Sequence, residues 1–403
     1  MNTDHTFHLE KAKDLQKNHI IIDSMAPNVL SEFVMTPEMI KYAKKLQKEG
    51  KKRSEICSKL SDFLLNSCEK DSQTRKSYLE YWDRSGVGVC HNTLYAFGPP
   101  ETAWDSLINE FSRFNRLMNS MDGKIIQAGS SKDIVFAKQH GLKSVIQNIQ
   151  SPEPIGENFD RVDVLYGLGL RSMQLTYNLR SRFAEGCLER NDGGLSRFGV
   201  SLIEKLNHSN IMVDVSHGSP LTAYDSATVS VKPIIASHTA AHALSKHARA
   251  LPDKSIKAIA DRGGYIGVLM LPAFIIPADG DGRAEKFGKP KGWATLDSVV
   301  DHVEYILNLA GEDHIGIGTD WGKPYYNALT WTSDMINESK QGFDWVAWRP
   351  QDRFDPNMQV LGMETWDMWP NLIAALLSRG ISEKVVLKII GGNFLRVFQE
   401  VCG

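Results

Sequence analysis

The stretch from Ile211 to His238 decides the fold that we expect, because it reads as strand, helix and strand in succession. It consists of IMVDVSH (211–217), the polar SPLTAYDSATVS (219–230) and KPIIASH (232–238). Ser219 and Pro220 form a favourable N-cap and first-turn pair for a helix of about two to three turns. A strand–helix–strand unit of this kind is the parallel crossover, which is nearly always right-handed.

Both predicted strands end in Ser-His, and the two histidines, His217 and His238, are 21 residues apart. Because the strands of a crossover unit point the same way, we expect both histidines at carboxyl ends, on one rim. Parallel α/β proteins place ligands and catalytic groups on that rim, and imidazole is the commonest protein ligand for zinc and similar metals. The unit therefore predicts a metal site; the alternative is two unrelated histidines that follow strands.

The composition is that of an ordinary soluble globular chain. The 403 residues are 42% hydrophobic and 23% charged, and the formal net charge of -2 indicates neither a nucleic-acid nor a membrane-surface partner. Five scattered cysteines without CxxC spacing indicate a reducing compartment and exclude a thiolate zinc site. The polar first residues lack the apolar region of a leader, so we expect a cytoplasmic protein.

Working outward from the central unit, buried strands alternate with helices along most of the chain. The strands are expected at 20–24, 86–94, 143–150, 171–178, 211–217, 232–238, 264–271 and 314–320. Helical periodicity is clearest at 101–121 and 295–310, and two helices at 368–378 and 382–398 close the chain, the second broken by Gly391 and Gly392. Eight such units predict a (β/α)₈ TIM barrel.

We expect two additions to this barrel, which as a single domain spans residues 19–403. Residues 1–18 are predicted to form a helical extension packed outside the main fold. An insert at about 321–362, rich in Trp and Tyr, follows the last strand. A loop of this length is usually a lid or a binding element, although it could instead be a surface excursion packed by its own aromatic side chains.

Taken together, the motifs resemble those of the renal (membrane) dipeptidase family of metallopeptidases, peptidase family M19. The resemblance rests on VDVSH, ASH, HARALPD, GIGTD and GGNFLRVF in their order and spacing, and it covers about residues 20–400. It implies an amidohydrolase-like (β/α)₈ barrel that holds two zinc ions and hydrolyses dipeptides. The family often forms dimers, which makes a homodimer possible here.

The resemblance also assigns roles to residues of this chain. His217 and His238 match the histidines that bind the family's second zinc. Arg249 matches the arginine that holds the substrate carboxylate, and Asp320 matches the aspartate that handles the proton of the attacking water.

Several positions depart from the family pattern. Met25 and Pro27 stand where the family has a His-x-Asp pair that binds the first zinc, and neither side chain is a useful zinc ligand. Gln147 stands where the family has a glutamate that bridges the two metals. Tyr177 stands where the family has a histidine that contacts the reacting carbonyl oxygen. Tyr177 could still donate a hydrogen bond to an oxyanion. Asp23 remains from the first-strand motif, in which it is not a primary ligand.

The losses remove two negative charges from the site, so we expect one divalent metal rather than two. His217 and His238 would hold zinc, or equally iron, with the remaining positions drawn from water and from Asp320, Gln147, His91 or Asp23. The predicted function is a metal-dependent hydrolase that acts on a dipeptide or a related small amide, with Asp320 and Tyr177 catalytic and Arg249 and Gln147 binding the substrate. The alternatives are a non-hydrolytic mononuclear metal enzyme acting on an amino-acid-derived metabolite, and a binding protein that has lost catalysis.

Overall fold

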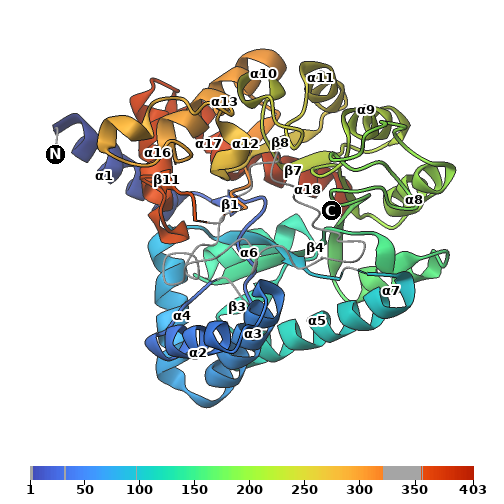
Figure 1. Cartoon of the computed structure of the whole chain (residues 1–403), viewed down its shortest axis with the longest axis horizontal. Coiled ribbons are helices and arrows are strands. Elements are labelled where there is room, and N and C mark those ends of the chain that lie inside the picture. The colour runs from blue at the N-terminus through green and yellow to red at the C-terminus, as the bar shows by residue number, and fades with distance from the viewer. Residues whose placement is uncertain (1–2, 31–32, 97, 321–354, 356) are drawn as a thin grey trace.

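A computed structural model describes residues 3–30, 33–96, 98–320, 355 and 357–403. Parallel strands occupy the centre and helices surround them (Figure 1). The strand order is β1-β2-β4-β5-β6-β7-β8-β10, which is also the chain order of the predicted strands. The strands are β1 (Ile22–Asp23), β2 (Val89–Leu94), β4 (Lys143–Ile149), β5 (Leu170–Gln174), β6 (Met212–Asp214), β7 (Ile235–Thr239), β8 (Tyr265–Val268) and β10 (Ile315–Ile317).

Backbone hydrogen bonds between the first and last strands close the barrel. The Ser24 N–H donates to the Ile317 carbonyl at 3.0 Å, and the Asp320 N–H donates to the Met25 carbonyl at 2.7 Å. The predicted (β/α)₈ barrel is therefore confirmed. The sequence patterns did not reveal the short strand β3 (Ile125–Gln127) beside β4, or the pair β9 (Ala294–Thr295) and β11 (Val360–Leu361).

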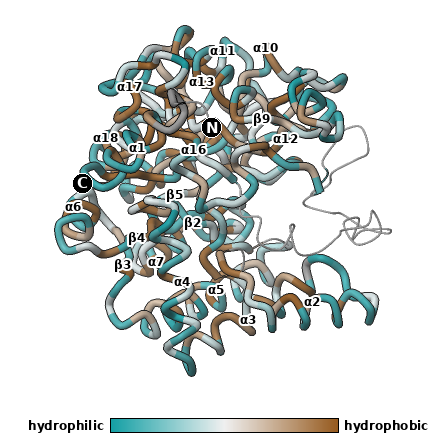
Figure 2. Tube along the Cα trace, turned by 90° about the vertical axis from the view of Figure 1, so that its left-hand side faces the viewer, coloured by the Kyte–Doolittle hydropathy of each residue, from teal (hydrophilic) through white to brown (hydrophobic). Residues whose placement is uncertain are grey.

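The helices form where apolar side chains recur on one face. In α5 (Pro100–Ser120), the predicted inward residues Leu107, Phe111, Phe114 and Leu117 are all buried. The other long helices are α2 (Pro37–Lys48), α3 (Arg53–Lys70), α4 (Ser72–Ser85), α6 (Ser131–Gln139), α7 (Asp160–Gly167), α8 (Arg197–His208), α9 (Pro220–Val229), α11 (Asp253–Asp261), α13 (Leu296–Ala310) and α16 (Trp369–Ser378). Hydrophilic residues occupy much of the outer surface of these helices (Figure 2).

The first helix, α1 (Thr3–Asn18), lies against α16 (Figure 1). Its Ala12 and Leu15 side chains are buried in the main hydrophobic core, and Gln16 Nε2 donates to the Ser85 carbonyl at 2.6 Å. The helix is thus built into the core through one face. The aromatic insert predicted at 321–362 lies outside the described residues, apart from 355 and 357–362.

The last helix seals the amino-terminal end of the barrel. The predicted helix at 382–398 is divided into α17 (Glu383–Leu387), one π turn (Lys388–Gly392) and α18 (Asn393–Cys402). A Cβ at Gly391 would lie 2.4 Å from the Ile20 carbonyl oxygen, so this approach to the chain just before β1 requires glycine. Phe394 of α18 then packs with Ile22, Val89 and Tyr265, the first residues of three strands or close to them.

Candidate metal centre

His217 and His238 lie side by side at the carboxyl ends of β6 and β7, and their Nε2 atoms are 3.0 Å apart. Both side chains are buried, at 3% and 0% exposure. Two zinc ligands at tetrahedral positions would place their nitrogens about 3.3 Å apart. The structure thus brings together the two histidines that the central sequence unit predicts on one rim.

The hydrogen bonds of the other ring nitrogens fix where each proton lies. His217 Nδ1 is 2.8 Å from Asn178 Oδ1, which only accepts, so the proton of His217 is on Nδ1. His238 Nδ1 is 2.8 Å from Ser237 Oγ, whose own hydroxyl donates to Asp214 Oδ2 at 2.5 Å, so His238 also carries its proton on Nδ1. Each Nε2 is therefore left with a lone pair, and the two lone pairs face each other.

Protonation does not relieve this contact readily. Burial lowers the pKa of both His217 and His238 well below the usual range, and the neighbouring Arg249 guanidinium lowers both further. Two neutral imidazoles with facing lone pairs repel each other, and a cation between them converts repulsion into coordination. The donor set therefore fits a divalent metal held by two nitrogens.

Tyr177 and Arg249 lie next to the histidine pair, and Asp320 lies close enough to both to affect their pKa values. The Tyr177 ring stacks on the His217 ring, with centroids 4.0 Å apart and planes 20° apart. Burial raises the pKa of Tyr177, and Asp320 raises it further, so Tyr177 keeps its proton and acts as a hydrogen-bond donor. Burial lowers the pKa of Arg249, whereas Cys187 and Asp320 oppose that effect. Tyr177, Arg249 and Asp320 thus lie within electrostatic reach of one another.

Asp320 is held in an uncommon backbone conformation, with φ of 50°. A non-glycine residue in the left-handed region is mildly strained, although aspartate tolerates it better than most. The hydrogen bond from Asp320 N–H to the Met25 carbonyl keeps the chain there. Strain held by a barrel-closing contact is typical of a residue whose side chain must point in a particular direction.

Arg249 is almost fully buried and contacts the chain on both sides of the histidine pair. One terminal nitrogen donates to the Ser216 carbonyl, and the other donates to the His238 carbonyl at 3.0 Å. A guanidinium has five N–H donors, so three remain, and the buried Nε–H has no acceptor among the described residues. Arg249 can therefore position the two histidine-bearing turns and still bind an anion.

Met25, which stands where the resemblance expects a ligand of the first metal, lies among neutral polar side chains. Thr93 Oγ1 and Gln150 Nε2 each donate to Met25 Sδ at 3.3 Å, and Asn148 Nδ2 donates to Thr93 Oγ1 at 3.2 Å. All four side chains are buried. We call these residues, Met25, Thr93, Asn148 and Gln150, the neutral cluster.

The role expected of Gln147 stays a prediction, although the contacts of the two glutamines favour Gln150 for the position of the bridging glutamate. Gln147 Oε1 accepts from Asn92 Nδ2 at 3.0 Å, whereas the glutamine that contacts Met25 is Gln150. Gln147 lies within β4, directly opposite Asn92 of β2, whereas Gln150 follows Ile149, the last residue of that strand. Sequence reasoning missed Gln150, although it ends the predicted strand at 143–150.

His91 lies inside the barrel, three residues before the end of β2. Strand β2 continues to Leu94, so His91 is not near its carboxyl end. Its Nδ1 is 2.6 Å from the Ser24 carbonyl oxygen, and its ring packs against Phe394, with centroids 5.3 Å apart, at the sealed end. We therefore leave His91 out of the proposed metal ligands.

The Asp23 carboxylate makes hydrogen bonds that help to close the barrel. Its two oxygens accept from the Thr319 N–H (2.8 Å), Thr319 Oγ1 (2.6 Å), Trp366 Nε1 (2.8 Å) and the Met25 N–H (3.2 Å). Within the described part of the chain, no three His, Cys, Asp or Glu side chains group closely enough to hold a metal ion. Asp23 is thus placed with the structural residues rather than with the ligands.

Asp23 also gives a testable dependence of stability on pH. Burial raises its pKa to about 6 in spite of its hydrogen bonds, whereas the unfolded value is about 3.9. The folded protein therefore binds the extra proton between these values, and the free energy of unfolding falls as pH rises through this window, by about 3 kcal/mol from this group. Urea unfolding at pH 4, 5 and 6.5 should show that Asp23→Asn removes this pH dependence of the free energy of unfolding. The control Asp14→Asn, at an exposed position, should keep it. The same dependence on pH in the parent and both variants would contradict the assignment.

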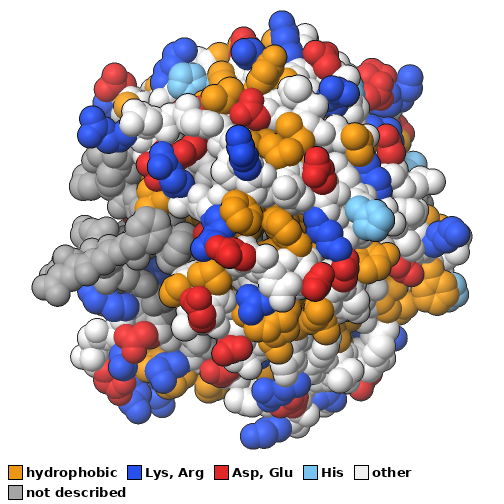
Figure 3. All heavy atoms as spheres, turned by 90° about the vertical axis from the view of Figure 1, so that its right-hand side faces the viewer, with side chains coloured by type: hydrophobic (Ala, Val, Ile, Leu, Met, Phe, Trp, Pro, Cys, Tyr) orange, Lys and Arg blue, Asp and Glu red, His pale blue; other side chains and the backbone are white. Residues whose placement is uncertain are grey.

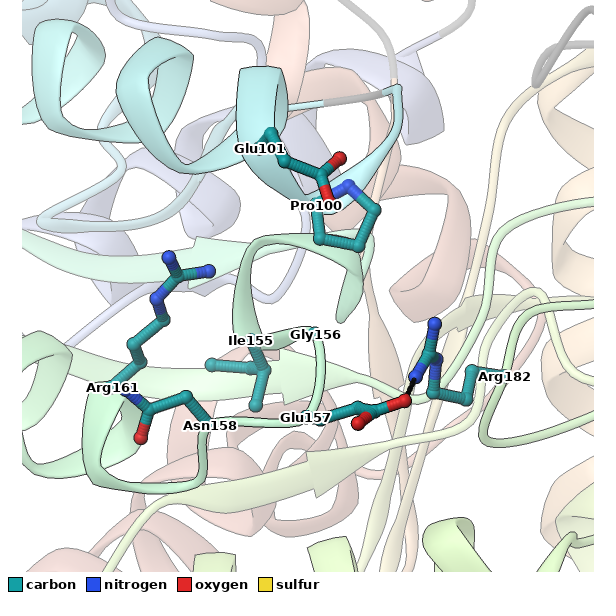
Figure 4. A pocket seen from close by; sticks show the side chains of 8 residues that line it. All are labelled: Pro100, Glu101, Ile155, Gly156, Glu157, Asn158, Arg161 and Arg182. Atoms are coloured by element: carbon teal, nitrogen blue, oxygen red, sulfur yellow. Dashed lines mark hydrogen bonds and ion pairs between the residues drawn. The ribbon is translucent and has the colours of Figure 1, made fainter.

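A separate cavity of about 530 Å³ lies between the start of α5 and the segment that follows β4 (Figure 4). Three of its charged side chains, Arg161, Arg182 and Glu157, already have partners. Arg182 pairs with Glu157, and Arg161 donates to the Pro154 carbonyl at 2.8 Å while lying over the Trp104 ring. We assign it no function. On the face drawn in Figure 3, basic and acidic side chains are interspersed, and hydrophobic side chains form small patches.

The sequence profile described as membrane dipeptidase (peptidase family M19) matches residues 9–330 and 352–402. The chain belongs to this family. The family resemblance of the sequence motifs is thereby confirmed over nearly the whole chain.

Individual relatives support the same grouping. Dipeptidase aclJ of Aspergillus oryzae is 27% identical over 291 residues, which cover 71% of this chain and 59% of that protein. The chain thus spans somewhat more than half the length of this M19 relative. The crystal structure of an amidohydrolase from Pseudomonas aeruginosa has a TM-score of 0.70 at 25% identity, over 97% of this chain and 99% of that one.

A third comparison shows the fold alone. The structure of a metallo peptidase from Rhodobacter sphaeroides, liganded with a phosphinate mimic of the dipeptide L-Ala-D-Ala, has a TM-score of 0.66 at 18% identity and covers 84% of this chain and 97% of that one. Among the described helices of this M19 member, none is both long and apolar enough to cross a membrane.

Proposed function

We propose that this M19 protein is a metal-dependent hydrolase of small amides, with a single metal held by His217 and His238. The observation that carries the proposal is the 3.0 Å separation of His217 Nε2 and His238 Nε2, whose lone pairs face each other. Each ring is fixed by a hydrogen bond at its Nδ1. Similarity to proteins named as dipeptidases supports the hydrolytic reaction class. A divalent metal bound there would supply Lewis-acid polarisation of the scissile carbonyl and activation of water.

The surrounding residues can divide the remaining work. Asp320 would accept the proton of the attacking water, because it is the carboxylate whose charge acts on both Tyr177 and Arg249. Tyr177 would donate its hydrogen bond to the oxyanion as charge develops there. Arg249 would anchor a substrate carboxylate with its remaining N–H donors.

The neutral cluster supports a mononuclear site. A second divalent metal beside the first needs anionic ligands to offset its charge, and Met25 and Gln150 are neutral and hydrogen-bonded to each other. The same loss of charge disfavours the ammonium group of an ordinary dipeptide. We therefore expect acyl amino acids without a free amino group to be better substrates than dipeptides. The cytoplasmic location and the homodimer expected from the sequence stay predictions.

The test combines metal analysis with a substrate panel. Protein reconstituted with zinc or iron should contain one metal per chain, and it should hydrolyse N-acetyl amino acids faster than the corresponding dipeptides. A chelator should stop the reaction, and added metal should restore it. One bound metal without hydrolysis of any amide would overturn the hydrolase proposal and favour the non-hydrolytic alternative that the neutral cluster also permits.

Replacing Arg249 with lysine should raise KM for a carboxylate-bearing amide by about 10-fold or more. Lysine keeps the charge, but it cannot serve two backbone carbonyls and a carboxylate with a planar fork, and a charged hydrogen bond contributes roughly 1.5–3 kcal/mol. Steady-state kinetics should be measured beside the control Arg262→Lys, which replaces the exposed C-cap residue of α11. If Arg249→Lys changes neither KM nor kcat, Arg249 has only a structural role.

A further inference from the structure

Asp214 is a buried carboxylate at the end of β6 that the proposed reaction does not use. Its Oδ1 accepts three hydrogen bonds, from the Ser216 N–H (3.0 Å), Ser216 Oγ (2.6 Å) and the Ser237 N–H (3.1 Å). Its Oδ2 accepts from Ser237 Oγ at 2.5 Å and, more weakly, from Gln174 Nε2 at 3.4 Å. Asp214 thus binds the residue before each histidine, and it joins the ends of β6 and β7.

The contact from Oδ2 continues to the proposed metal ligand. Because the carboxylate can only accept, the Ser237 hydroxyl proton points to Asp214, and the Ser237 oxygen is left to accept from His238 Nδ1 at 2.8 Å. The Ser216 hydroxyl adds a second restraint, because it accepts the His238 backbone N–H at 3.0 Å. Asp214 therefore fixes the direction of the Ser237 hydroxyl, and Ser237 in turn fixes which nitrogen of the His238 ring carries the proton.

We infer that Asp214 is a positioning residue that acts through Ser237 to keep the His238 proton on Nδ1 and its Nε2 lone pair turned to His217. The significance of this lone pair for metal binding rests on the proposed function, whereas the proton position itself does not. Groups that orient metal-binding histidines in this way commonly change metal affinity by 10–100-fold when they are replaced.

The substitution Asp214→Asn should reverse the direction of these hydrogen bonds. The three donors at Oδ1 require an oxygen there, so the new amide nitrogen must take the place of Oδ2 and donate to Ser237 Oγ. The Ser237 hydroxyl would then donate to His238 Nδ1, and the proton of His238 would move to Nε2. An Nε2–H donor can pair with His217 Nε2, but it cannot bind a metal.

Two measurements on the full-length protein test the inference. In metal-free protein with ¹⁵N-labelled histidine, the ring shifts of His238 should report protonation on Nδ1, and Asp214→Asn should move it to Nε2. Titration with zinc alone should show affinity about 10–100-fold weaker in Asp214→Asn and in the milder Ser237→Ala. Ser237→Thr keeps the hydroxyl and should retain affinity, and Asp163→Asn on the surface is the matched control.

The outcomes separate this inference from the function on which its significance rests. An unchanged proton position and unchanged zinc affinity in both Asp214→Asn and Ser237→Ala would overturn it. A shifted proton in a protein that hydrolyses no amide would uphold the positioning role and overturn only the proposed hydrolase. Loss of zinc affinity without a shift in the proton, together with a fall in thermal stability equal in Ser237→Thr, would assign Asp214 a merely structural role.

Discussion

Replacing His238 with glutamine is expected to weaken metal binding by at least about 100-fold and to abolish metal-dependent turnover. Removing one of two histidine ligands should exceed the 10–100-fold effect of a supporting group. The metal-free variant should nevertheless be at least as stable as the metal-free parent. In the parent, the Nε2 lone pairs of His217 and His238 face each other, with the two atoms 3.0 Å apart, whereas a glutamine amide can donate a hydrogen bond to His217 Nε2. Calorimetric zinc titration and thermal unfolding with and without zinc measure both effects.

The exposed His208, in the last turn of α8, provides the matched control. His208→Gln should bind zinc like the parent and should show the same increase in thermal stability on metal binding. If His238→Gln retains the parental affinity, the metal lies elsewhere, and the histidine pair is not its site.

Introducing an imidazole and two carboxylates at Met25, Pro27 and Gln150 is expected to raise the metal content from one to two per chain. The triple substitution Met25→His, Pro27→Asp and Gln150→Glu supplies the missing ligand types and two negative charges. Two unit charges about 4 Å apart repel by roughly 4 kcal/mol at an effective dielectric of 20, and two divalent ions by about four times that. Without the added carboxylates, this repulsion leaves the second metal unbound.

A second triple variant with Gln147→Glu in place of Gln150→Glu tests the choice between the two glutamines. Since Gln147 is hydrogen-bonded to Asn92 and not to Met25, this variant should still bind one metal. Metal analysis after zinc saturation, with crystallographic location of the sites, distinguishes the two variants. Two fully occupied metals in the unaltered protein would contradict the mononuclear proposal, and plain dipeptidase chemistry would then be favoured.

Much of this architecture could be predicted from short-range pattern. Apolar runs that end in turn residues gave all eight barrel strands, because burial on both faces leaves a recognisable β-branched stretch. The repeated Ser-His ending placed His217 and His238 on one rim, since parallel strands of a crossover unit must share their direction. The absence of metal-binding side chains at Met25 and Pro27 is likewise a matter of residue type.

The tertiary structure decided which side chains meet. The register of β4 against β2 places Gln147 opposite Asn92, so Gln150, one residue beyond the strand, is the glutamine that contacts Met25. His91 contacts the Ser24 carbonyl inside the barrel, and barrel closure brings Asp23 to Trp366, 343 residues away. Asp214 stands within the motif VDVSH, yet its role depends on the direction of hydrogen bonds across two strands. Residue types limit the chemistry that a site can perform, whereas register and hydrogen-bond direction, which arise only when distant strands pair, select the groups that perform it.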